Sequence, residues 1–170
     1  IAGVDFGFTN PTGILIGAFK DGKLYILDEW KRDKKTTPEI IERCKQFDRQ
    51  WNVGRWYPDP AEPDRIEEMS RAGLFCGEVN KDVEYGISVV KSLIKEKKLF
   101  INKKCVDLID ELDQYRYDEG TEAPIKENDH LLDSARYMIV GAELTKEDRF
   151  KEMYGGRNFN DKMISVWRNE

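Results

Sequence analysis

Hydrophobic residues at the start of the chain are grouped in short runs of the length of β-strands. The runs cover residues 1–8, 13–19 and 23–30, and polar or turn-forming residues separate them. Between the second and third runs stands the pair Asp21-Gly22, which is favoured in tight β-hairpins. The pattern therefore predicts three strands that follow one another in an antiparallel meander.

From residue 37 onward, helical periodicity alternates with short hydrophobic runs. Thr37, Pro38 and Glu39 have the composition of a helix start, with Thr37 as the cap, and hydrophobic residues follow at helical spacing up to Trp51. Asn128 is expected to cap the last helix. Further helices are predicted over 62–72, 82–95, 105–112 and 128–144, and short strands over 53–59, 74–79 and 99–101. In the 82–95 helix, Val83, Ile87, Val90 and Ile94 fall on one face.

A meander followed by alternating helices and strands predicts an α/β fold. Its central sheet is expected to be mixed, with the antiparallel three-strand meander joined by parallel strands and flanked by helices. Residues 1–145 are expected to form one domain. The segment 146–170 has little periodicity and is expected to be a C-terminal tail. Because the chain starts with Ile1 and not with methionine, we expect it to be part of a longer polypeptide.

Composition restricts the class of protein further. With 39% hydrophobic and 36% charged residues, the chain has enough apolar residues for a folded core. No apolar stretch approaches the roughly 20 residues of a membrane span, so no membrane partner is expected. Three widely spaced cysteines, at 44, 76 and 105, favour a reduced cytosolic protein without a zinc site. The net charge of −5 argues against tight autonomous binding to nucleic acid.

Three acidic positions are candidates for chemistry. Asp5 lies inside a hydrophobic run, where a carboxylate is costly unless it is paired or bound to a metal. Asp59 closes a predicted strand, at the end where ligand-binding side chains gather in α/β sheets. Asp129 and Asp133 fall on one face of the last helix together with His130, the only histidine. Turn or cap aspartates and a solvated acidic face would explain each position separately.

Taken together, the acids predict a metal centre. Residues from the first strand, the fourth strand and a late helix can converge on one edge of the sheet. Mg²⁺ and Mn²⁺ prefer carboxylate oxygens, and two such ions can activate water and stabilise the leaving oxygen of a phosphodiester. The sequence contains no serine elbow or phosphate-binding Walker loop that would favour another chemistry. Metal-assisted phosphodiester hydrolysis is therefore the leading hypothesis.

Three stretches also resemble a known family. GVDFGFTNPT at 3–12, DPAEPDRIEE at 59–68 and NDHLLDSARY at 128–137 are similar in order and spacing to the nuclease domain of phage terminase large subunits, the motor proteins of DNA packaging. The resemblance implies a ribonuclease H-like fold and a metal-dependent endonuclease that cuts concatemeric double-stranded DNA in the host cell cytoplasm. It also implies in-line attack by water that leaves a 3′-hydroxyl and a 5′-phosphate.

The resemblance implies a role for each candidate residue. Asp5 would bridge two Mg²⁺ or Mn²⁺ ions, and Asp59 and Asp133 would each complete one side. Asp129 could replace Asp133 or share its role, and the sequence does not separate the two. His130 would tune a ligand or assist proton transfer.

The resemblance also implies partners. A motor ATPase domain would precede Ile1, and the capsid portal and the small terminase subunit would bind the complete protein. Basic clusters at 31–35, 95–98 and 103–104, and more weakly Lys81, could contact DNA, although solvated surface lysines would give the same pattern. Two alternatives remain: another ribonuclease H-like nuclease, such as a junction resolvase, and a non-catalytic docking domain. A sugar-kinase-like phosphotransferase would need a longer chain.

Overall fold

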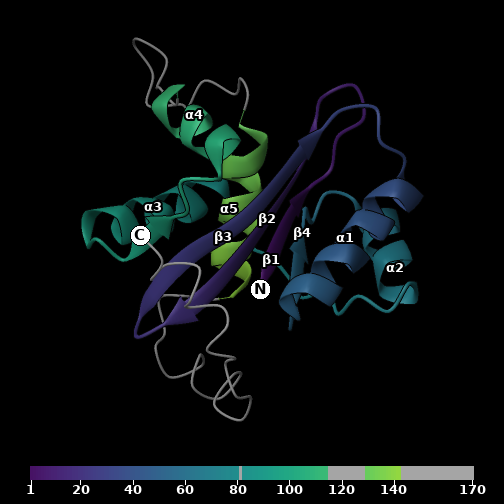
Figure 1. Ribbon diagram of the computed structural model, residues 1–170, viewed down its shortest axis with the longest axis horizontal. Coiled ribbons are helices and arrows are strands. Elements are labelled where there is room, and N and C mark those ends of the chain that lie inside the picture. Colours follow the sequence, from purple (N-terminus) through teal and green to yellow (C-terminus); the bar gives the residue numbers. More distant parts are fainter. Residues whose placement is uncertain (81, 115–128, 143–170) are drawn as a thin grey trace.

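A central five-stranded sheet with helices on both faces forms the fold (Figure 1). The computed structural model describes residues 1–80, 82–114 and 129–142; Lys81, Asn128 and the predicted tail lie outside these ranges. The strands are β1 (Ala2–Asp5), β2 (Thr12–Lys20), β3 (Lys23–Arg32), β4 (Trp56–Pro58) and β5 (Leu99–Ile101). The helices are α1 (Thr37–Trp51), α2 (Pro63–Arg71), α3 (Val83–Lys95), α4 (Val106–Gln114) and α5 (His130–Gly141).

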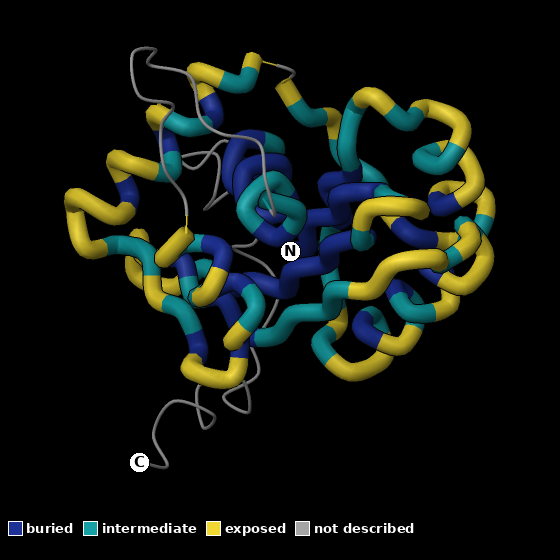
Figure 2. Tube along the Cα trace, turned by 90° about the horizontal axis from the view of Figure 1, so that it is seen from above, coloured by how far each residue is buried: buried dark blue, intermediate teal, exposed yellow. Residues whose placement is uncertain are grey.

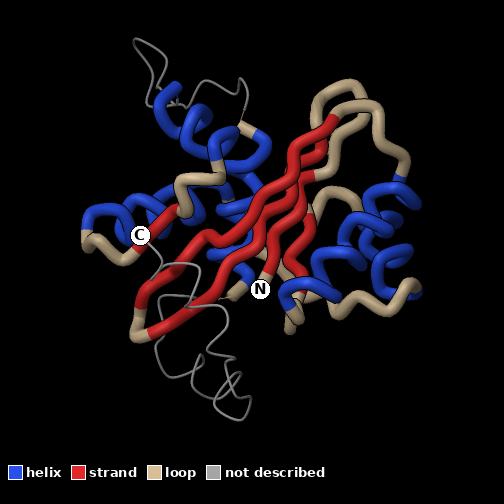
Figure 3. Tube along the Cα trace, in the orientation of Figure 1, coloured by secondary structure: helices blue, strands red, loops and turns tan. Residues whose placement is uncertain are grey.

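The sheet is mixed, as predicted. Its strand order is β4-β1-β2-β3-β5, with β1, β2 and β3 in an antiparallel meander. Strand β4 pairs parallel with β1, and β5 pairs parallel with β3 (Figure 3). Asp21 and Gly22 have φ angles of 51° and 71°, so both turn residues adopt the left-handed conformation that matches the twist of a hairpin. The predicted Asp-Gly hairpin is therefore confirmed.

Two apolar layers cover the two faces of the sheet. Ile14 and Ile16 of β2 pack with α1 and α2 on one side, whereas Leu15 packs with α5 on the other. Because both faces of β2 are buried, its hydrophobic residues form a continuous run. Figure 2 shows buried residues concentrated in the sheet and α5 and exposed residues along the outer segments. Within the described ranges, no helix combines the length and the apolar character needed to cross a bilayer.

The strand predicted over 74–79 is wrong. Its only bridge in the described ranges joins Cys76 to Trp56. Strand β4 is three residues long, and the segment shares two backbone hydrogen bonds with it: Trp56 N donates to Phe75 O, and Gly77 N donates to Trp56 O. The next donor on this edge of β4 would be Pro58, which has no N–H, so the pairing ends after a single bridge.

The most buried face of α3 is not the apolar face seen in the sequence. Gly86, Val89 and Leu93 are buried, whereas Ile94 is 49% exposed. A side chain at Gly86 would lie 2.7 Å from the side chain of Arg136 on α5, so the glycine marks the place where α3 approaches α5. A count of apolar residues misses this contact because glycine contributes no apolar side chain to the pattern.

The predicted helix caps are each displaced by one residue. Thr36, not Thr37, caps α1: its backbone N–H donates to Glu39 Oε2 at 2.9 Å. At α5 the cap position is Asp129, not Asn128.

Candidate functional site

Helix α5 lies almost in contact with the backbone of β1 and β2. A Cβ atom at Gly3 would overlap the carbonyl oxygen of Ser134, and one at Gly13 would lie 2.7 Å from the carbonyl oxygen of His130. Only glycine permits so close an approach at these positions. The first turn of α5 is therefore placed beside Asp5, the last residue of β1.

Ser134 joins α5 to both strands. Its buried hydroxyl accepts a hydrogen bond from Asp5 N at 3.1 Å and lies 3.0 Å from Gly13 O and 2.8 Å from His130 O, to which it can donate. The serine thus holds the backbone of Asp5 in place without contacting its carboxylate.

Substitution of Ser134 by alanine is expected to destabilise the fold by about 1–3 kcal/mol, because the buried Asp5 N–H would lose its acceptor. Urea unfolding of the two proteins would measure this difference. Ser88→Ala is the matched control, since its hydroxyl bonds to Tyr85 O in an exposed position. Equal unfolding free energies for the two variants would contradict the expected role of Ser134.

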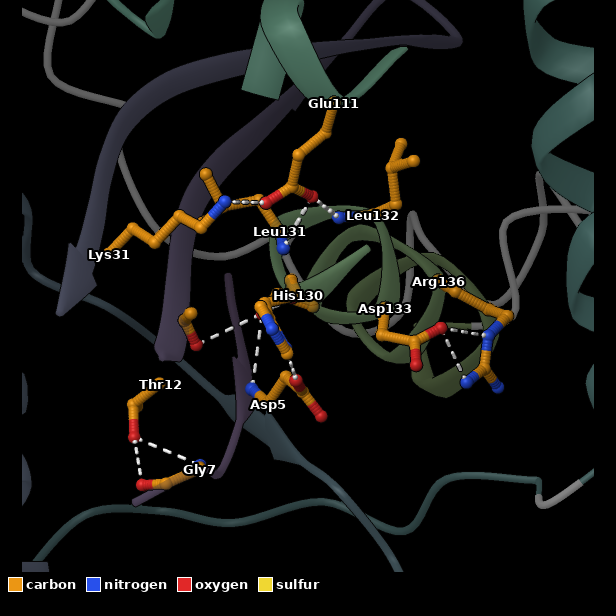
Figure 4. Close-up of polar contacts among 12 residues, drawn as sticks. Asp5, Gly7, Thr12, Lys31, Glu111, His130, Leu131, Leu132, Asp133 and Arg136 are labelled. Carbon is orange, nitrogen blue, oxygen red and sulfur yellow. Dashed lines mark hydrogen bonds and ion pairs between the residues drawn. The ribbon is translucent and has the colours of Figure 1, made fainter. Parts of the chain in front are cut away.

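Asp5 and His130 form the centre of the candidate site. Asp5 is 8% exposed, and its Oδ2 lies 3.2 Å from Nδ1 of His130 (Figure 4). Burial raises the pKa of Asp5 to about 6, and the negative charges of Asp133 and Asp59 also raise it, against the hydrogen bond with His130. The same hydrogen bond raises the pKa of His130.

Asp59 stands directly after β4, beside the end of β1. Its N–H donates to Val4 O at 2.8 Å, which extends the parallel pairing of β4 with β1 by one step. Its Oδ1 accepts a hydrogen bond from Ala61 N at 2.9 Å. Asp59 therefore accepts a hydrogen bond within a turn, as the alternative explanation predicted. It also lies at the same edge of the sheet as Asp5.

The two acids of α5 differ in their surroundings. Asp133 Oδ1 accepts hydrogen bonds from Nε and Nη2 of Arg136 at 3.0 and 2.8 Å, and Figure 4 shows its carboxylate turned toward that guanidinium. The charge of Asp133 acts on Asp5, whereas the charge of Asp129 acts on His130. Asp133 is thus electrostatically linked to the Asp5 carboxyl directly.

The negative charges of the predicted acids also act on the buried side chain of Tyr137. Burial raises the pKa of Tyr137, and the negative charges of Asp133 and Asp59 raise it further. Asp5 acts on it in the same direction. Tyr137 was not among the residues predicted from the sequence, because a tyrosine at a helical core position looks like an ordinary core residue.

The carboxylates share one region but not one coordination shell. In the described part of the chain, no three His, Cys, Asp or Glu side chains lie close enough together to hold one metal ion. The donor set nonetheless fits a hard divalent cation, because its oxygens are the ligands that Mg²⁺ and Mn²⁺ prefer. A bound cation would also relieve the repulsion that Asp59 and Asp133 exert on Asp5.

Some of the lysines predicted to contact DNA form ion pairs within the chain. Lys31 forms an ion pair with Glu111 at 2.7 Å, and Lys35 forms one with Glu39 at 3.0 Å. Lys98 pairs with Glu96 at 2.9 Å. Lys81 lies outside the described residues.

Comparison with known proteins identifies the family. The model of the Terminase RNaseH-like domain matches residues 2–141. The terminase large subunit of Escherichia phage T5 is 28% identical over 153 residues, which cover 82% of this chain and 34% of that protein. The PBSX phage terminase large subunit of Bacillus subtilis (strain 168) is 24% identical over 165 residues, 91% of this chain and 38% of that protein. The chain thus spans little more than a third of these relatives.

Solved structures agree with this assignment. The large terminase of a thermophilic bacteriophage superimposes with a TM-score of 0.75 at 27% identity, covering 81% of this chain and 38% of that one. The g2p nuclease domain of bacteriophage SPP1, with bound Mn, gives 0.66 at 18% identity over 81% and 83% of the two chains. The large terminase nuclease of the thermophilic phage G20c, with bound magnesium, gives 0.67 at 16% identity over 80% and 77%.

At these identities the SPP1 and G20c structures demonstrate a shared fold. The resemblance to terminase large subunits and the ribonuclease H-like sheet predicted from the sequence are both confirmed. This chain belongs to the family of the Terminase RNaseH-like domain.

Proposed function

We propose that this domain is a metal-dependent endonuclease that cuts concatemeric double-stranded DNA during packaging of a phage genome. The observation that carries the proposal is the buried Asp5 carboxyl at the end of β1, whose pKa is raised toward 6 partly by the charges of Asp133 and Asp59. A buried carboxyl whose pKa is raised by neighbouring acids at a sheet edge is typical of sites that receive divalent cations. Mn and magnesium in the SPP1 and G20c nuclease structures support this choice.

The proposed ligands are Asp5, Asp59 and Asp133, with two Mg²⁺ or Mn²⁺ ions as cofactors. When bound, these cations would supply the Lewis acidity that phosphodiester hydrolysis requires. The β1 and β4 backbones hold Asp5 and Asp59 at one edge, and α5 brings Asp133 to the same edge. Arg136 limits the rotamers of Asp133 through two hydrogen bonds to one oxygen.

His130 is proposed to orient the Asp5 carboxylate and to hold a proton near it. The ring is half-buried, and the carboxylate 3.2 Å away favours its protonated form. Such a contact restrains an acidic ligand in the manner of residues that surround metal centres.

The partners of the complete protein are also proposed from the family. We expect an ATPase domain in the same polypeptide, and the capsid portal and small terminase subunit as binding partners in the host cytoplasm. Residues 1–145 are proposed as the nuclease domain, with the segment from 146 onward outside it.

The direct test is conversion of supercoiled plasmid to nicked and linear forms by the 170-residue chain. We expect conversion in Mn²⁺ or Mg²⁺ and none in EDTA, because the reaction depends on the cation. Conversion that persists in EDTA would refute the proposed chemistry. Absence of both conversion and Mn²⁺ binding by titration calorimetry would favour a docking module.

The same assay separates the two acids of α5. Asp133 acts on the Asp5 carboxyl, whereas Asp129 occupies the cap position of the helix. Asp133→Asn is therefore expected to lose conversion, and Asp129→Asn to retain most of it. The opposite ranking would transfer the proposed ligand role to Asp129.

A further inference from the structure

Glu111 on α4 is a buried carboxylate that contacts the start of α5. Its Oε2 accepts hydrogen bonds from Leu131 N at 2.8 Å and Leu132 N at 2.9 Å (Figure 4). Its Oε1 pairs with Lys31 Nζ of β3 at 2.7 Å. Because the first N–H groups of a helix have no partner inside the helix, Glu111 satisfies one buried and one partly buried donor that would otherwise lack an acceptor in the protein.

A second carboxylate places α4 in the same way. Glu29 of β3 accepts hydrogen bonds from Asp107 N at 2.9 Å and Leu108 N at 3.0 Å, in the first turn of α4. Strand β3 therefore holds α4 through Glu29, and α4 together with Lys31 holds α5 through Glu111. The chain of contacts starts in the sheet and ends at the turn that carries His130 and Asp133.

Glu111 caps a helix, and this cap also affects the candidate site. Its two acceptor bonds fall on the residues that directly follow His130, whose ring contacts Asp5. A shift of this turn along the sheet would move His130 and Asp133 relative to Asp5.

We infer that Glu111 is a positioning residue for the candidate site: its carboxylate, held by Lys31, fixes the first turn of α5 and with it the placement of His130 and Asp133 against Asp5. The link to metal binding rests on the proposed function. The position of the α5 turn itself does not, and it can be measured without any metal.

The test compares Glu111→Gln with wild type in the 170-residue chain. Glutamine has one acceptor oxygen, so it cannot serve both Lys31 and the N–H groups of α5. We expect faster hydrogen exchange at the amides of Leu131 and Leu132. We also expect Mn²⁺ binding weakened about 10- to 100-fold by calorimetry, the range for residues that orient metal ligands.

Two controls separate positioning from loss of stability. Glu39→Gln makes the same chemical change at the start of α1, a helix on the other face of the sheet. Glu39 accepts a hydrogen bond from Thr36 N and forms an ion pair with Lys35. Phe47→Leu removes volume from the core beneath α1 and lowers stability without touching α5. Both controls are expected to leave Mn²⁺ affinity and exchange in the first turn of α5 unchanged.

The outcomes are distinguishable. Mn²⁺ affinity in Glu111→Gln equal to that of both controls would overturn the inference, even if exchange in α5 became faster. Wild-type chain that binds no Mn²⁺ would refute the proposed metal centre. In that case exchange alone decides: faster exchange at Leu131 and Leu132 supports the placement of the turn by Glu111, and unchanged exchange overturns it.

Discussion

Replacement of Asp5 by asparagine is expected to abolish metal-dependent plasmid conversion and to make the metal-free domain more stable at pH 7. Activity is lost because asparagine replaces the central one of the three proposed carboxylate ligands by a neutral amide, which binds a hard divalent cation more weakly. Stability rises because the charged carboxylate is buried, 8% exposed, and close to two other negative charges.

The direction of the stability change follows from the pKa of Asp5. Its value is about 6 in the folded protein, against an ordinary 3.8. The folded state therefore binds the proton more tightly, and stability falls as pH rises from below 4 to above 6. At pH 7 the Asp5 carboxyl is mostly charged, and its raised pKa corresponds to a loss of about 3 kcal/mol in folding free energy. This is the upper limit of the gain in Asp5→Asn, because asparagine also buries a polar group. The melting temperature of Asp5→Asn should exceed that of wild type by up to roughly 6–12 °C.

Melting curves in EDTA at pH 7 and pH 4 would measure the effect, which is expected at the higher pH only. Asp64→Asn, on the exposed side of α2, is the control for loss of one negative charge. Added Mn²⁺ should raise the melting temperature of wild type and leave that of Asp5→Asn nearly unchanged. Plasmid conversion by Asp5→Asn at the wild-type rate would remove Asp5 from the mechanism. A lower melting temperature at pH 7 would show that the charged form is favoured in the fold.

The sheet was predictable because its determinants are local in the sequence. The Asp21-Gly22 turn fixes the β2–β3 hairpin, and the uninterrupted run of β2 reflects burial on both faces. The strand predicted over 74–79 failed because its partner edge in β4 offers the backbone groups of Trp56 and then Pro58, which has no N–H. The partner edge is not encoded in the segment itself.

The acids proposed as ligands are those that the sequence had singled out, whereas the residues that support them were not predicted. Asp5 and Asp59 were identifiable because each stands where a carboxylate conflicts with a hydrophobic strand or follows one. Glu111 and Ser134 gave no such signal: a glutamate on an amphipathic helix and a serine in a core stripe have ordinary local explanations. Their roles arise from contacts between residues 20 and 129 positions apart. Only the folded chain brings these pairs together.

The spacing between α5 and the sheet depends on single glycines, which gives the second large effect. Gly3→Ala would place a methyl group on the carbonyl oxygen of Ser134 and 3.0 Å from Cβ of Met138. The clash joins the Cβ of residue 3 to a backbone oxygen, so no change of side-chain rotamer can relieve it. Helix α5 would have to move away from β1, which breaks the hydrogen bond from Asp5 N to Ser134 and disrupts the apolar layer beneath the helix. We expect a loss of more than about 4 kcal/mol.

Gly17→Ala provides the matched comparison on the neighbouring strand. The added methyl group would lie 3.0 Å from the sulfur and 3.1 Å from the terminal methyl of Met138, the far end of a flexible side chain. Because methionine can change rotamer, this variant should lose no more than about 1–3 kcal/mol. Urea unfolding monitored by circular dichroism would rank the two variants. If Gly3→Ala is as stable as Gly17→Ala, α5 does not depend on close backbone contact with β1, and the placement of His130 beside Asp5 must come from other contacts.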